Sequence, residues 1–132
     1  MMDDSAFEAQ RERVMDLVHR WKPIIADEWL IHLNWSRDPA EDEPWGDPKP
    51  CAEAHYRWDY LEGSITFHLP RCEPLDDGEI EKVVVHELSH FLVSEAIEST
   101  SLTVLRSRKE HLTTQVQRAL MAAAESGEVK AS

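Results

Sequence analysis

The sequence predicts an α+β fold: an N-terminal helix, a small, mainly antiparallel sheet of three to four strands, and two packed C-terminal helices. Three observations predict it. Apolar residues recur at helical spacing near the N-terminus, alternate in three short central segments, and recur at helical spacing again in the C-terminal half. The 132 residues fit a single domain, which we place at residues 1–127. Residues 128–132 are expected to fray.

The N-terminal helix is predicted from Ser5 to about Trp21. Its apolar residues recur at spacings of three, four and seven, with charged residues between them. Ser5 and Glu8 match a capping box, and Pro23 lies just beyond the expected end. The pattern is that of an amphipathic helix.

Three segments alternate apolar and polar residues with a period of two, which is typical of half-buried strands. They are Trp29–Trp35, Ala52–Tyr60 and Ser64–Leu69. Gly63 marks a turn between the second and the third, so these two predict a β-hairpin with its turn near Leu61 and Glu62. The proline-rich segment 36–50 is expected to be an exposed, irregular loop.

The two cysteines do not form a disulfide framework. Cys51 and Cys72 fall opposite each other at the open end of the predicted hairpin, so a cross-strand disulfide is geometrically conceivable. Pro70 and a reducing compartment favour two free thiols instead.

The C-terminal half is predicted to be helical. Asp76 or Asp77 can cap a helix whose apolar residues between Ile80 and Ile97 point in almost every direction, which indicates a buried helix. A last helix is predicted from about Leu102 to Ser126. Its expected core stripe consists of Leu105, Leu112, Val116, Ala119, Leu120 and Ala123.

Charge and hydropathy exclude several classes of partner. The formal net charge is -12, and so acidic a surface repels phosphate backbones, so we expect no nucleic-acid partner. No segment approaches the ~18 consecutive apolar residues needed to cross a bilayer, so no membrane span is expected. The segment Met1–Gln10 carries acids and has no apolar core, unlike a signal peptide. The expected location is cytoplasmic.

The segment His86-Glu87-Leu88-Ser89-His90 carries the strongest chemical signal. Two histidines four positions apart on a helix are separated by about 40° around its axis, so both rings project from one face and can bind one zinc ion. Glu87 is rotated by about 100° from His86, so it flanks the metal without binding it. There it can act as a general base on a metal-bound water and then protonate the leaving amine. Burying these polar groups in an apolar helix requires a compensating cation.

A catalytic zinc ion takes a third protein ligand and leaves a fourth position for water. Glu110 is the first choice, because its side of the last helix opposes the expected apolar stripe and should face a cleft. The alternatives are His111, Glu95, Glu98 and His68. His55 and His68 lie on polar faces of the predicted strands and are expected to be exposed.

With this motif and a helical glutamate after it, the sequence resembles the gluzincin clan of zinc metallopeptidases. Its short length points to the minigluzincins and to short His-Glu-x-x-His proteins of phages and prokaryotes. The resemblance covers residues from about 28 to 124. It implies a zincin-like fold, in which a small twisted sheet packs on the active-site helix and a second helix supplies the glutamate ligand. It also implies that the strand Ser64–Leu69 pairs with an extended peptide substrate.

The same resemblance implies a role for each site residue. His86, His90 and Glu110 would be the Zn²⁺ ligands, and Glu87 the general base. His111 is a candidate, by position alone, for the residue that holds the oxyanion. The expected function is therefore zinc-dependent hydrolysis of peptide bonds, with a peptide or protein as the substrate. The alternatives are a proteolytically inactive or latent zinc-binding interaction module, or purely structural helices.

Overall fold

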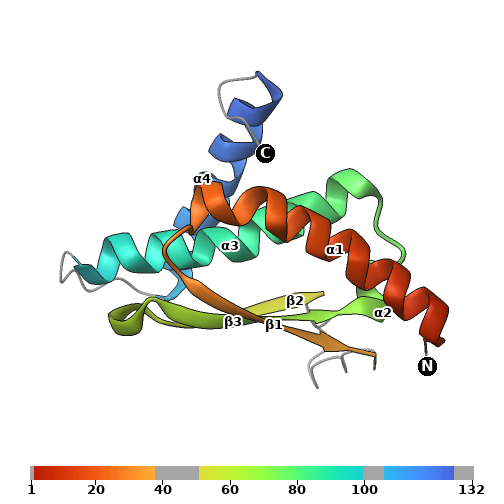
Figure 1. Cartoon of the computed structure of the whole chain (residues 1–132). Helices are drawn as coiled ribbons and strands as arrows, with labels where there is room; N and C mark the ends of the chain where they lie inside the picture. The colour runs from red at the N-terminus through yellow and green to blue at the C-terminus, as the bar shows by residue number, and fades with distance from the viewer. Residues whose placement is uncertain (1, 38–50, 100–105, 127–132) are drawn as a thin grey trace.

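The computed structural model describes residues 2–37, 51–99 and 106–126, and within these ranges the fold is α+β, with four helices and a three-stranded sheet (Figure 1). The expected loop 36–50, apart from its first two residues, and the tail 128–132 lie outside the described residues. In chain order the elements are α1 (Asp4–Ile25), β1 (Leu30–Ser36), β2 (Ala52–Arg57), a 3-10 turn (Trp58–Tyr60), β3 (Glu62–His68), α2 (Leu69–Cys72), α3 (Asp77–Ser99) and α4 (Arg106–Glu125).

The sheet is mixed, with the strand order β1-β3-β2. β2 pairs antiparallel with β3, as the hairpin predicts, but β1 pairs parallel with β3 over its whole length. The prediction of a mainly antiparallel sheet was therefore wrong. The Leu30 N–H donates to the Leu61 carbonyl at 2.9 Å, so β1 and β3 start side by side at the same end of the sheet and must run in the same direction.

Helices α1 and α3 lie over the same side of the sheet (Figure 1), and except for the exposed Leu30 the apolar residues of the three strands pack against the core on that side. Because the side chains of a strand alternate, this face is set by the period-two pattern of each segment. Trp35 of β1 stacks on Phe67 of β3 with ring centroids 5.5 Å apart, and Tyr56 of β2 meets Phe91 of α3 edge to face at 6.0 Å. The core between sheet and helices is completed by fully buried residues of the two helices: Val14, Val18, Trp21, Ile80, Val84, Val85 and Leu88.

The hairpin differs in detail from the prediction. β2 ends at Arg57, and the reversal is made by the 3-10 turn and Leu61, which adopts a φ of 49°. Gly63 is not in the turn but within β3, where a Cβ atom would lie 2.4 Å from both the His55 carbonyl oxygen and Cε1 of Phe91. The glycine is needed because α3 packs closely on the sheet at this point.

Helix α1 is longer at both ends than predicted. Asp3, rather than Ser5, caps its N-terminus by accepting a hydrogen bond from the Ala6 N–H at 2.8 Å. At the other end the helix includes Pro23 and continues to Ile25, which is buried in the core. Pro23 lies in the last turn, where its missing N–H removes only one intrahelical hydrogen bond, and burial of Ile25 compensates for that loss.

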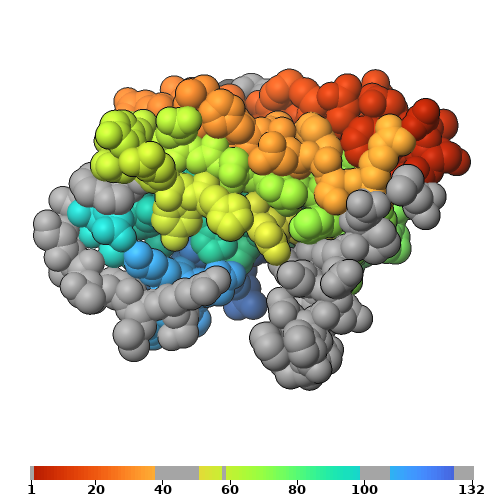
Figure 2. Space-filling view, turned by 90° about the horizontal axis from the view of Figure 1, so that it is seen from below, coloured from red at the N-terminus to blue at the C-terminus, as the bar shows by residue number. Residues whose placement is uncertain are grey.

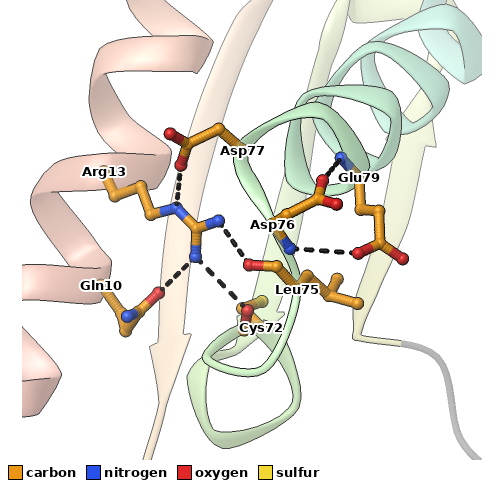
Figure 3. Close-up of polar contacts among 7 residues, drawn as sticks. All are labelled: Gln10, Arg13, Cys72, Leu75, Asp76, Asp77 and Glu79. Carbon is orange, nitrogen blue, oxygen red and sulfur yellow. Dashed lines mark hydrogen bonds and ion pairs between the residues drawn. The ribbon is translucent and has the colours of Figure 1, made fainter.

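The start of α3 confirms the predicted cap at Asp76. The Glu79 N–H donates to the Asp76 carboxylate at 2.8 Å, and the Asp76 N–H donates to the Glu79 carboxylate at 3.1 Å (Figure 3). This reciprocal pair is a capping box, which satisfies two backbone N–H groups that the helix itself leaves without partners.

Arg13 ties α1 to the segment that joins α2 and α3 (Figure 3). Its guanidinium donates to the carbonyl oxygens of Leu75 and Cys72 and to the side chain of Gln10, and it pairs with Asp77 at 3.1 Å. Asp77 is 97% exposed, so the partly buried carbonyl contacts contribute most to stability.

Helix α4 packs on α3 with a face that differs from the predicted stripe. Thr113 is fully buried, and the apolar side chains of α4 that pack against the core are Leu120, Met121 and Ala124. Ala119 is exposed, and Leu112 and Val116 are only partly buried. The face of α4 that meets α3 includes polar residues, which form hydrogen bonds with the histidines of α3. None of the helices in the described ranges combines the length and the apolarity needed to span a membrane.

Candidate metal centre

Helix α3 places the two histidines of the motif on one face, one turn apart. The rings of His86 and His90 lie with centroids 4.8 Å apart and planes at 90°, and their side chains are 19% and 17% exposed. Other sides of the same helix carry Val84, Val85 and Leu88, which are fully buried in the core. Packing of these apolar residues therefore fixes the direction in which the two imidazoles project.

Glu110 of α4 lies directly opposite both histidines. One oxygen of its carboxylate is 2.7 Å from His86 Nε2, and the other is 3.3 Å from His90 Nε2. One ligand atom from each of the three residues lies within 4.8 Å of the others, and among the described residues no other such group of three is found. This His-His-Glu group could hold a metal ion, and Glu110 occupies the position that the sequence predicted for the third ligand.

Two further residues of α4 orient the imidazoles from behind. The Gln117 side-chain oxygen is 3.3 Å from His86 Nδ1, and the Thr113 hydroxyl oxygen is 3.4 Å from His90 Nδ1. The Thr113 hydroxyl donates to the Lys109 carbonyl at 2.8 Å, so its oxygen accepts the proton of His90 Nδ1. A histidine that carries its proton on Nδ1 in this way keeps its Nε2 lone pair for a metal ion, and Gln117 offers His86 the same arrangement when His86 Nδ1 is the donor.

The donor atoms of this site are arranged to face a positive charge. A neutral imidazole has one N–H, so a histidine whose Nδ1 donates it toward α4 has no proton on Nε2. Each Nε2 nevertheless faces a carboxylate oxygen of Glu110, which also carries lone pairs. Two sets of lone pairs that face each other require a positive charge between them, supplied by protons or by a metal ion. The donor set therefore fits a metal ion.

Glu87 lies beside this group, 8% exposed. Burial, and next the charge of Glu110, raise the pKa of its carboxyl from 4.5 to about 8, with smaller contributions from Cys51 and Glu53. Burial also lowers the pKa of His90, an effect that the Glu110 carboxylate opposes and His86 reinforces. A carboxyl that titrates near neutrality in a cleft is suited to take up and release a proton.

The site lies at the side of a cleft of about 890 Å³ between β2 on one side and α3 and α4 on the other. In the view from below, α3 is visible between the yellow atoms of β2 and the blue atoms of α4 (Figure 2). Besides the residues of the metal group, the polar and reactive side chains that line it include Cys51, Glu53, Tyr56, Lys82, Glu87 and Gln117.

The strand beside the cleft is β2, not the strand Ser64–Leu69 implied by the resemblance. That segment forms most of β3, which is the central strand. Its backbone groups pair with β1 on one side and β2 on the other, so it offers no free edge to a peptide. Within the described part of the chain β1 and β2 are the two edge strands, and the residues of β2 line the cleft.

The other candidates for the third ligand are placed elsewhere. Glu95 accepts a hydrogen bond from the Trp29 indole N–H at 3.0 Å, and Glu98 pairs with Lys109 at 2.8 Å. His111 is exposed and is not among the residues that line the cleft, so its role at the oxyanion stays a prediction that no contact supports.

The two histidines of the sheet differ from each other. His55 is exposed, as predicted, and lies at the cleft. His68, at the end of β3, was also expected to be exposed, but both of its ring nitrogens are buried, and none of the described residues forms a hydrogen bond with them. It is not part of the metal group.

Sequence reasoning did not assign a role to Thr113. The contact of Gln117 with His86 was not predicted either. Both follow Glu110 at spacings of three and seven, which is the signal that places them on the same helix face. No protein-family model, curated protein or solved structure matches the chain. The resemblance to the gluzincins therefore rests on the motif and Glu110 and stays a prediction.

Proposed function

We propose that this protein is a zinc-dependent hydrolase of peptide bonds. The proposal depends on one observation: the ligand atoms of His86, His90 and Glu110 lie within 4.8 Å of one another, with Glu87 beside them at the same cleft. Two imidazole nitrogens and one carboxylate oxygen are the donor set of a catalytic zinc site with one open position. When bound, zinc acts as a Lewis acid that polarises a carbonyl group and acidifies water.

Glu87 is the residue to which we assign proton transfer. Its carboxylate takes a proton from the attacking water and holds it while the carbon–nitrogen bond breaks, then delivers it to the leaving amine. In the metal-free protein burial raises the pKa of Glu87. A group that is basic enough to accept a proton and acidic enough to donate it near neutral pH suits both steps.

Edge strand β2 is the element we propose for substrate binding. An extended peptide can add to an exposed sheet edge through backbone hydrogen bonds, while side chains lining the groove confer selectivity. Tyr56 of β2 lines the cleft opposite the metal group and offers a hydroxyl donor. We propose that this hydroxyl stabilises negative charge that develops on the reacting carbonyl oxygen, in the role first considered for His111.

The test separates metal binding from catalysis. Unstructured casein is incubated with the purified protein over a series of zinc concentrations, and fragment release is measured. Glu87→Gln should keep the zinc content and lower the rate of cleavage by about 10² to 10⁴-fold, the usual contribution of a general base. His86→Ala should lose both the metal and the activity. Glu12→Gln, at an exposed position of α1, is the matched control and should keep both.

Two outcomes would contradict the proposal. If Glu87→Gln cleaves casein like the wild-type protein, the assignment of the base is wrong. If the wild-type protein binds zinc at about one ion per chain but releases no fragments at any zinc concentration, the proteolytically inactive alternative holds.

A further inference from the structure

We infer that Cys51 and Cys72 form a redox-active dithiol in the wall of the cleft, which a small disulfide such as oxidised glutathione converts into an intramolecular disulfide. This inference uses a pair of residues that the proposed hydrolysis does not involve. It identifies a site of covalent modification next to the candidate metal centre.

The backbone brings the two cysteines together. Cys51 precedes β2, and its carbonyl accepts a hydrogen bond from the His68 N–H at 2.8 Å, which holds it beside the end of β3. The four-residue helix α2 then turns the chain back, so that Cys72 lies over Cys51. The Cys72 Sγ atom is 3.7 Å from the Cys51 carbonyl oxygen, to which its thiol donates a hydrogen bond. Both are free.

The two thiols differ in access. Cys51 is partly exposed and lines the cleft, whereas Cys72 is fully buried. The position of Cys72 is fixed by the Arg13 guanidinium, which donates to its carbonyl oxygen at 3.5 Å and also to the carbonyl of Leu75 (Figure 3). A dissolved oxidant can therefore reach only Cys51, and the second sulfur is already held next to it.

The contacts also make Cys51 the more nucleophilic thiol. The hydrogen bond from Cys72 is the main cause that lowers the pKa of Cys51 to about 7, and the charge of Arg71 contributes in the same direction. The neighbouring Cys51 thiol, and next burial, raise the pKa of Cys72. Once Cys51 is bound to another sulfur, the contribution of its thiol to this raised pKa disappears, while that of burial remains.

The reaction proceeds by two thiol–disulfide exchanges. The Cys51 thiolate attacks one sulfur of oxidised glutathione, which forms a mixed disulfide and releases one glutathione thiolate. Cys72 then gives up its proton and attacks the Cys51 sulfur, and the second glutathione leaves. The two protein thiols lose two electrons and two protons, and one oxidised glutathione becomes two reduced glutathione molecules.

The experiment treats the full-length protein with oxidised glutathione and follows free thiols and intact mass. The wild-type protein should lose both thiols, decrease in mass by two hydrogen atoms and carry no glutathione. Cys72→Ala should stop at a stable mixed disulfide with one glutathione on Cys51. Cys51→Ser should react at least about tenfold more slowly than the wild-type protein, since the remaining thiol is buried.

The product formed by the wild-type protein, compared with that of Cys72→Ala, decides the inference. A product that retains one glutathione per chain, or a protein that keeps both thiols under conditions that fully modify Cys72→Ala, would overturn the inference. Equal reaction rates of Cys51→Ser and the wild-type protein would overturn the assigned order of attack. Circular dichroism of each variant checks that it is folded. These readouts need neither zinc nor a peptide substrate, so they are independent of the casein experiment.

Discussion

Replacing Glu87 by glutamine should stabilise the metal-free protein, and the stabilisation should grow with pH. The pKa of this carboxyl is about 8 in the folded protein and 4.5 as the reference for the unfolded chain. Between these values the folded state binds more protons than the unfolded state, so the wild-type protein loses stability as the pH rises from about 4.5 to about 8. The Glu87→Gln side chain has nearly the same shape and carries no charge, so it avoids this loss.

The structure sets the size of the effect. At about 1.4 kcal/mol per pH unit, the gap between the two pKa values corresponds to about 5 kcal/mol at pH 8.5, and to less than about 1 kcal/mol at pH 5. Glu87 is only 8% exposed, so solvent screening reduces this value little. The quantity to compare is the free energy of unfolding of the variant minus that of the wild-type protein.

Urea unfolding followed by tryptophan fluorescence, in the presence of a chelator, measures this difference at several pH values. Glu12→Gln, an exposed position on α1, serves as the control and should change stability by less than about 0.5 kcal/mol at any pH. A Glu87→Gln difference that stays constant between pH 5 and pH 8.5, or that favours the wild-type protein at the higher pH, would refute the reasoning from burial.

Three further predictions test other parts of the structure. Gln117→Ala should weaken zinc binding about 10- to 100-fold in a chelator-competition titration, because His86 loses its orienting contact, whereas Gln115→Ala on the exposed side should not. Gly63→Ala should destabilise the protein by about 1 to 3 kcal/mol in urea unfolding, because the added methyl group overlaps the backbone of β2 at His55 and the side chain of Phe91 in α3. An unchanged unfolding midpoint would contradict this close approach. Arg13→Ala should cost about 1 to 3 kcal/mol and Asp77→Ala less than about 1 kcal/mol, and equal losses would mean that the exposed ion pair dominates.

Local patterns predicted the elements well but their ends less well. The period-two segments became the three strands because alternation of side chains is a property of the extended backbone alone. The end of α1 was missed because burial of Ile25 outweighs the break expected at Pro23. Gly63 was predicted to be a turn residue. It is needed instead because Phe91, a residue distant in the sequence, packs closely against it. Such errors arise where a long-range contact decides a local feature.

The residues of the candidate site also differ in how far the sequence could predict them. His86, Glu87 and His90 could be assigned from the sequence alone, because a helix with 3.6 residues per turn dictates their relative directions wherever it lies. That Glu110 faces these histidines depends on the packing of α4 against α3, for which the sequence offered only a preference among several acids and histidines.

The sequence by itself determined the order of the three long helices and the three strands, the apolar face of each strand and the geometry of the histidine pair, since each depends on backbone periodicity within one segment. The short helix α2 was not predicted. Only the tertiary structure decided that β1 runs parallel to β3, that β2 rather than β3 borders the cleft, and which face of α4 meets α3. These features depend on how separate elements pack together. The pattern within one segment is compatible with several such arrangements, and only the contacts between segments select one of them.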